Sequence, residues 1–186
     1  STGIAIPGVQ IKIDNPNEEG VGEILTKGDN VMLGYYNDEE ATARVLRDGW
    51  FHTGDLGYMD GADGALYIRG RIKNVIVTPN GKNIYPEELE TRLDDKPEIK
   101  ESLVLAAKSD EAKVKAKIFP DLDYIKELIG HEPSAEEITE AVKAAVADVN
   151  AQMPHYKHID AVDILTRPLE RTTTQKVLRY GANVEQ

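Results

Sequence analysis

The chain has 186 residues, 40% hydrophobic and 30% charged, which is typical of a soluble globular protein with one or two domains. Its formal net charge of −11 disfavours nucleic acid and anionic membranes as partners, because both carry negative charge themselves. It contains no cysteine and no run of about 18 apolar residues, so we expect no disulfide, no thiolate metal site, no transmembrane segment and a cytoplasmic location.

The first part of the chain predicts short strands and one helix. Residues 9–14 alternate apolar and polar side chains as a strand does, residues 22–27 predict a second strand with Ile24 and Leu25, and residues 31–33 can add a third. Asp38 is expected to cap a short helix, whose end would be buried at Val45 and closed by the turn that follows.

A hairpin is expected next, from residues 51–59 and 64–68. The turn between them is rich in Gly and Asp, but it lacks the acidic spacing and the bidentate Glu of a calcium loop. Residues 1–72 therefore predict a small β-rich subdomain.

The stretch from Gly70 to Glu90 is the most informative part of the chain. Its run 75–77 is rich in β-branched residues, and the Asn80-Gly81 pair that follows tolerates positive φ, so a hairpin is predicted. Pro86 suits the first position of a helix. By pattern alone, this stretch fits a hairpin that contacts a ligand and an ordinary surface hairpin equally well.

Residues 73–186 predict an α+β domain, with a three-stranded sheet, a hairpin and covering helices. The predicted strands are 102–107, 113–117 and 159–165, and the predicted helices are 86–94, 121–129 and 134–151. In 113–117 the three lysines are interpreted as a solvated face, opposite a buried apolar one. His155 and His158 are interpreted as surface residues, because no further metal ligand accompanies them.

Three motifs in this order resemble the second half of the adenylate-forming enzymes: Trp50 to Leu56 (WFHTGDL), Gly70 to Glu90, and Glu170 to Arg179 (ERTTTQKVLR). The superfamily includes acyl-CoA synthetases, luciferases and peptide-synthetase adenylation domains. The resemblance covers essentially the whole chain. It implies that residues 1–72 end a large N-terminal adenylation domain, most of which is missing, and that residues 73–186 form the C-terminal lid domain.

The resemblance also implies roles for five residues. Asp55 matches the carboxylate that binds the ribose hydroxyls, although Thr-Gly-Asp in isolation is more often a turn. Arg71 matches the arginine that contacts the nucleotide, and Lys73 the hinge about which the lid swings. Gly81 matches the glycine lining the pantetheine tunnel for CoA. Lys176 matches the catalytic lysine between the attacking carboxylate and the α-phosphate.

The last motif departs from the family pattern, because Glu170 and Gln175 replace its usual proline and glycine. The resemblance implies an AMP-forming acyl-CoA synthetase that uses ATP, CoA and a small-molecule carboxylate, with a long-chain fatty acid favoured. Mg²⁺ is expected through the missing N-terminal part, so no metal ligand is assigned here, and the fragment is expected to be inactive by itself. Two alternatives stay open: an adenylation domain that loads a carrier protein, and a non-catalytic nucleotide-binding or interaction module.

Overall fold

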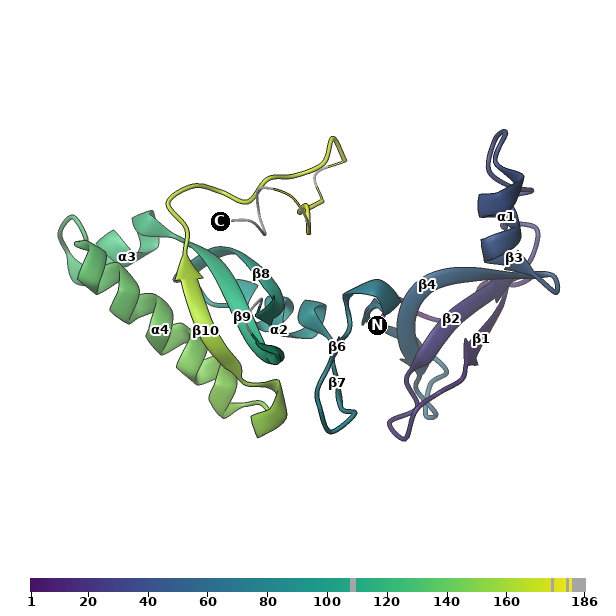
Figure 1. Ribbon diagram of the computed structural model, residues 1–186, viewed down its shortest axis with the longest axis horizontal. Helices are drawn as coiled ribbons and strands as arrows, with labels where there is room; N and C mark the ends of the chain where they lie inside the picture. The colour runs from purple at the N-terminus through teal and green to yellow at the C-terminus, as the bar shows by residue number, and fades with distance from the viewer. Residues whose placement is uncertain (108–109, 175, 180, 182–186) are drawn as a thin grey trace. The chain divides into compact units, whose positions relative to one another are not determined.

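The computed structural model describes residues 1–107, 110–174, 176–179 and 181 of the chain (Figure 1). The chain divides into two compact units, Ser1–Val75 and Ile76–Gln186, which we call unit 1 and unit 2. Each unit is described by itself. Helices and sheets occur together in the described residues, which confirms the predicted α+β class.

Unit 1, all of whose residues are described, contains a five-stranded antiparallel sheet. The long strand β4 is its centre, because β2 pairs with one edge of β4 while β3 and β5 pair in succession with the other. The strands are β1 (Gln10–Asp14), β2 (Gly22–Lys27), β3 (Leu46–Arg47), β4 (Trp50–Met59) and β5 (Leu66–Arg71).

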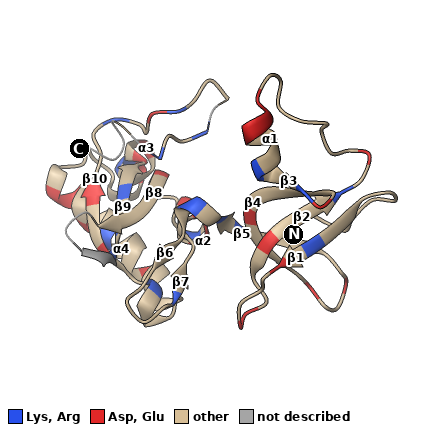
Figure 2. Cartoon of the chain, turned by 45° about the vertical axis from the view of Figure 1, so that its right-hand side comes forward, with Lys and Arg blue, Asp and Glu red and all other residues tan. Residues whose placement is uncertain are grey.

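Helix α1 (Glu39–Val45) begins as the sequence predicts. The Asp38 side chain accepts a hydrogen bond from the Ala41 N–H at 2.8 Å, and Figure 2 shows the acidic residues at the start of this helix. The predicted strand at 31–33 is wrong: within the described chain these residues form no strand, and Leu33 is fully exposed, so it has no core to pack against.

The helix end also differs from the prediction. Val45 is only half-buried, and the following Asp48-Gly49 pair does not serve as a helix stop. Both residues have positive φ, 52° and 78°, as a two-residue turn between strands requires. The pair therefore joins β3 to β4 as a hairpin.

Unit 2 contains a second sheet, three-stranded among the described residues, in the order β10-β9-β8. Strand β9 lies between antiparallel β8 and parallel β10. The predicted hairpin is also present (β6 with β7), followed by the predicted helix α2 with Pro86 at its first position. The elements are β6 (Ile76–Val77), β7 (Asn83–Ile84), α2 (Pro86–Asp94), β8 (Ile99–Ala107), β9 (Asp110–Pro120), α3 (Leu122–Ile129), α4 (Ala135–Ala151) and β10 (Ile159–Ile164).

The core of unit 2 lies between α2, α4 and one face of this sheet. Leu89 and Leu93 of α2 and Val142 of α4 are completely buried there. Helix α4 begins with the predicted capping box, in which Ser134 Oγ accepts from the Glu137 N–H and Glu137 accepts from the Ser134 N–H.

The lysines of β9 correct one prediction. Lys113 is exposed as expected and Lys115 pairs with Asp163 at 2.6 Å, but Lys117 is only 2% exposed. Its cross-strand neighbour Leu103 is completely buried as well, so this second face of the sheet is covered. The period-2 pattern identifies the two faces of β9, but it does not specify which of them meets solvent.

Candidate functional site

Asp55 and Arg71 lie directly opposite each other on β4 and β5. The Arg71 Nε lies 2.9 Å from the Asp55 Oδ1, and the side chains are 49% and 27% exposed. An exposed ion pair contributes little to stability, so a ligand can compete for either partner at small cost. The structure thus brings together the two residues that the sequence assigns to the nucleotide.

Strand β4 pairs irregularly with β2 just before Asp55, and hydrogen bonds to β2 hold this step in place. The Glu23 carboxylate accepts the Gly54 N–H at 3.1 Å with one oxygen, and the other oxygen lies 2.9 Å from the His52 Nδ1. The Thr53 hydroxyl donates to the Ile24 carbonyl at 2.8 Å. Sequence reasoning missed Glu23, although a carboxylate directly before the apolar pair Ile24-Leu25 is a signal that could have identified it.

Lys73 is exposed on η1 (Ile72–Asn74), a single turn of 3-10 helix that belongs to unit 1. The division between the two units lies shortly after it, between Val75 and Ile76. An exposed lysine beside such a division has the location that a hinge residue needs, but its role stays a prediction.

Gly81 lies in the tight turn between β6 and β7, where its N–H donates to the Thr78 carbonyl at 2.9 Å. Its φ of +72° favours glycine, and a Cβ placed there would meet no atom of the described residues within 4 Å. The turn geometry alone therefore explains the glycine, and the open space beside it is compatible with a channel.

Lys176 is exposed on a compact loop near the end of the chain. Its carbonyl accepts the Thr172 N–H at 2.8 Å, and its own N–H donates to the Thr172 hydroxyl at 3.1 Å. The Leu178 N–H donates to the Glu170 carbonyl at 2.9 Å. Lys176 is thus presented by an ordered loop, while Gln175, the departure from the family motif beside it, lies outside the described residues.

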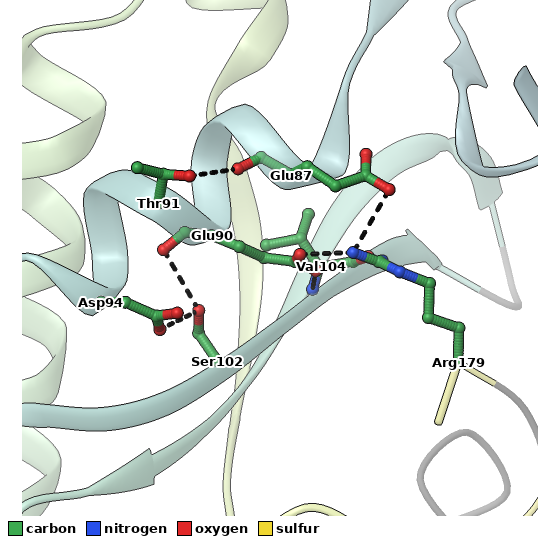
Figure 3. Close-up of polar contacts among 7 residues, drawn as sticks. All are labelled: Glu87, Glu90, Thr91, Asp94, Ser102, Val104 and Arg179. Carbon is green, nitrogen blue, oxygen red and sulfur yellow. Dashed lines mark hydrogen bonds and ion pairs between the residues drawn. The ribbon is translucent and has the colours of Figure 1, made fainter. Parts of the chain in front are cut away.

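Helix α2 covers the free edge of β8 with two carboxylates that sequence reasoning missed (Figure 3). Glu90 accepts the Val104 N–H at 2.7 Å, and Asp94 accepts the Ser102 hydroxyl at 2.7 Å. Residues four apart on a helix are separated by about 6 Å along its axis, and residues two apart on a strand by about 6.8 Å. The spacing of Glu90 and Asp94 on α2 therefore matches the spacing of Val104 and Ser102 on β8. The signal in the sequence was the i,i+4 spacing of carboxylates beside the buried leucines.

Burial determines the titration of both carboxylates. Desolvation raises the pKa of Glu90 above its ordinary value, although the charge of Arg179 and the Val104 N–H act in the opposite direction. Desolvation likewise raises the pKa of Asp94, although hydrogen bonds from Ser102 act to lower it. The partners of each carboxylate offset part of the cost of lost hydration, but not all of it.

Arg179 connects the end of the chain to this cluster. One guanidinium nitrogen donates to the Val104 carbonyl at 3.3 Å, and the other pairs with Glu90 and lies 3.5 Å from Glu87 (Figure 3). The arginine therefore completes the hydrogen bonding of the β8 edge at Val104.

The described part of the chain was compared with two further requirements, those of a metal site and of a membrane-crossing helix. No group of three or more His, Cys, Asp or Glu side chains there could hold a metal ion. None of the helices in that part is long and apolar enough to cross a membrane.

Comparisons with known proteins find one family of domains and several CoA ligases. Residues 73–185 match the family of AMP-binding enzyme C-terminal domains. Indoleacetate–CoA ligase of Aromatoleum aromaticum is 44% identical over 110 residues, 56% of this chain and 21% of the relative. Long-chain-fatty-acid–CoA ligase ACSBG1 of Bos taurus is 45% identical over 91 residues, 48% of this chain and 12% of the relative.

A solved structure extends the similarity to nearly the whole chain. O-succinylbenzoate coenzyme A synthetase (MenE) of Bacillus subtilis, in complex with AMP, aligns with a TM-score of 0.71 at 33% identity. The alignment covers 95% of this chain and 34% of that protein. The chain thus spans about a third or less of the proteins that it resembles.

Proposed function

This chain belongs to the family of AMP-binding enzyme C-terminal domains, and from this we propose that it is the C-terminal part of an AMP-forming acyl-CoA synthetase. The membership confirms the resemblance found in the sequence. In the proposed reaction, a carboxylate oxygen attacks the α-phosphate of ATP and displaces pyrophosphate. The CoA thiol then attacks the acyl carbon of the acyl-adenylate, and AMP leaves with the bonding electrons.

We assign the nucleotide to Asp55 and Arg71 of unit 1. A carboxylate can accept hydrogen bonds from both ribose hydroxyls, and a guanidinium can bridge ribose and phosphate oxygens. Their shared position across β4 and β5, and their partial exposure, support this assignment. Glu23 would fix the irregular step of β4 in front of Asp55, because its carboxylate accepts the Gly54 N–H.

We assign acyl-adenylate formation to Lys176. Its ammonium would lie between the attacking carboxylate and the α-phosphate and offset the repulsion of two anions. The observation that most supports this role is that the family match includes Lys176, on an exposed and hydrogen-bonded loop. Lys73 as hinge and Gly81 as part of the CoA channel complete the proposal, with Mg²⁺ expected on the N-terminal part.

The proposed acid is a long-chain fatty acid. The 45% identical long-chain-fatty-acid–CoA ligase supports this choice, whereas the 44% identical indoleacetate–CoA ligase supports an aryl acid. Palmitate and indoleacetate supplied separately to the full-length enzyme distinguish the two, and a higher kcat/KM for indoleacetate would overturn the fatty-acid choice. The cytoplasmic location stays a prediction.

The test of the function is Lys176→Ala in the full-length enzyme, assayed for each half-reaction. We expect the rate of acyl-adenylate formation from acid and ATP to fall by on the order of 10²–10³. The rate of thioester formation from synthetic acyl-adenylate and CoA should persist, because the thiol attacks a neutral carbonyl. Lys143→Ala, at an exposed lysine of α4, is the matched control. Equal losses in both half-reactions, or none in either, would contradict the role of Lys176.

A further inference from the structure

The loop that presents Lys176 is attached to the body of unit 2 on both sides by an arginine and a glutamate. On the first side, Arg171 donates to Glu101 at 2.8 Å, and the other oxygen of Glu101 accepts the Leu169 N–H at 2.8 Å. On the second side, Arg179 pairs with Glu90 (Figure 3). We call residues 171–179 the lysine loop.

The attachment on the second side is the more enclosed of the two. The side chains of Arg179 and Glu90 are 23% and 13% exposed, and Arg171 on the first side is 38% exposed. A guanidinium that also donates to the Val104 carbonyl is fixed in direction as well as in distance. Lys176 lies three residues before Arg179, so a displaced Arg179 would displace the lysine.

On the basis of the function proposed for Lys176, we propose that Glu90 and Arg179 are positioning residues for its ammonium during acyl-adenylate formation. Neither residue needs to touch the substrate. The pair holds the second side of the lysine loop against α2 and the β8 edge, and so keeps the ammonium where carboxylate and phosphate meet. A displacement of about 1 Å in a catalytic group can cost on the order of 10² in rate.

The two oxygens of Glu90 allow a selective substitution. One accepts the Val104 N–H of the sheet edge, and the other accepts from Arg179. In Glu90→Gln, the amide oxygen can still accept the Val104 N–H, but the amide N–H₂ is a donor facing the donors of the guanidinium. The variant should release the lysine loop while it keeps the sheet edge.

Glu88 offers a matched control on the same helix. It pairs with Lys157 at 2.8 Å, and its side chain is 14% exposed, close to the 13% of Glu90. Glu88→Gln therefore makes the same chemical change in an ion pair of similar burial. Lys157 lies in the 3-10 turn η2 (His155–Lys157), outside the lysine loop.

The kinetic experiment measures both half-reactions in the full-length enzyme. Glu90→Gln and Arg179→Met should each slow acyl-adenylate formation tenfold to a hundredfold, mainly through kcat, and leave thioester formation from synthetic acyl-adenylate within twofold. Because the two residues act through one another, the double variant should be no slower than the slower single variant. Glu88→Gln should leave both rates within twofold.

A second measurement needs no activity. In hydrogen exchange on the 186-residue chain, the N–H groups of Thr172 and Leu178 report the loop hydrogen bonds. We expect Glu90→Gln to speed their exchange at least tenfold, and Glu88→Gln to leave it unchanged. Unchanged exchange in Glu90→Gln would overturn the proposed attachment whatever the kinetics show.

The outcomes separate the two proposals. If Lys176→Ala does not slow acyl-adenylate formation, the role of Lys176 is wrong and the positioning role falls with it. If Lys176→Ala slows that step and Glu90→Gln does not, the positioning role alone is overturned. Equal slowing of both half-reactions by Glu90→Gln would indicate a merely structural residue and would also overturn it.

Discussion

At the scale of single residues, close approach of a neighbouring backbone requires glycine at position 57. Gly57 lies at an irregular step in the pairing of β4 with β5. A Cβ at this position would stand 2.3 Å from the Tyr67 carbonyl oxygen and 2.8 Å from the Ile24 Cδ1. Since a carbonyl of a paired strand cannot move aside easily, the side chain is excluded by packing rather than by φ.

Gly57→Ala should therefore destabilise unit 1, by about 1–3 kcal/mol if the strain resembles that of an overpacked core. Gly61→Ala is the control, because a Cβ on Gly61 meets no atom within 4 Å. Urea unfolding followed by the fluorescence of Trp50, which lies in unit 1, measures both variants. Equal stability of the two variants would show that β5 can shift to admit the methyl group.

Gly81 allows a sharper test of the proposed CoA channel. Gly81→Leu should hinder thioester formation and spare acyl-adenylate formation, so that pyrophosphate is released without acyl-CoA. Leucine at positive φ is strained wherever it stands, and Gly130, with φ of +80° and open space around it, supplies a control with the same strain. If Gly81→Leu and Gly130→Leu have the same effect on thioester formation, Gly81 does not line the channel.

At the scale of elements, α2 has two functions in the fold. Its leucines fill the core, while Glu90 and Asp94 accept hydrogen bonds from Val104 and Ser102 at the edge of β8. An uncovered edge strand can pair with another chain, so this arrangement also protects the sheet from aggregation. Both functions come from the 3.6-residue period, which places the leucines and the carboxylates in separate rows along the helix.

The raised pKa values of Glu90 and Asp94 predict how unit 2 responds to pH. Their ordinary values are 4.5 and 3.8, and burial raises the pKa of each in the folded state, against Arg179 and Ser102. A group whose pKa is raised by folding stabilises the folded state most at pH values below its ordinary pKa. This contribution is lost as the pH rises through the pKa that the group has in the folded state. Each carboxylate thus contributes more stability in mild acid than at pH 7.

Glu90→Gln removes one of these titrations. The free energy of unfolding of the wild type minus that of Glu90→Gln should decrease as pH rises from about 4.5 toward 7. Urea unfolding of unit 2, at several pH values and constant ionic strength, measures this difference. A difference that increases with pH would mean that the pair with Arg179 outweighs the desolvation of Glu90.

At the scale of the whole molecule, the described residues form separate cores in the two units. The core of unit 1 gathers around Ile24 and Leu25 of β2 and the preceding Val21, and that of unit 2 around α2, α4 and the second sheet. The predicted boundary between residues 72 and 73 and the division after Val75 lie close together in the chain. The assignment of the two parts to an N-terminal domain and a lid stays a prediction.

Separate cores predict separate effects of core substitutions. Leu93→Ala should cost unit 2 about 2–5 kcal/mol, because Leu93 is completely buried in α2. It should leave the hydrogen exchange of β2 and β4 in unit 1 unchanged. Gly57→Ala should speed the exchange of β2 and β4 and leave the exchange of unit 2 unchanged. A common loss of protection in both units, from either substitution, would show that they unfold as one cooperative body.

Much of the architecture follows from the sequence by itself, because the signals are local. Asp38 and Ser134 start helices through bonds to residues three positions ahead, and Pro86 and Gly81 satisfy backbone conformations at their own positions. The order of the motifs was also enough to identify the family. Asp55 and Arg71, sixteen positions apart, meet because the hairpin of β4 and β5 is itself a local structure.

The tertiary structure decided what depends on distant partners. Lys117 is buried although its pattern predicts a solvated face, and Leu33 is fully exposed although its pattern predicts a strand. Glu90 contacts Val104 and Arg179, which lie 14 and 89 positions away. Side-chain periodicity specifies which residues share a face, but burial and charge pairing depend on what the rest of the chain brings to that face, and no local pattern carries that information.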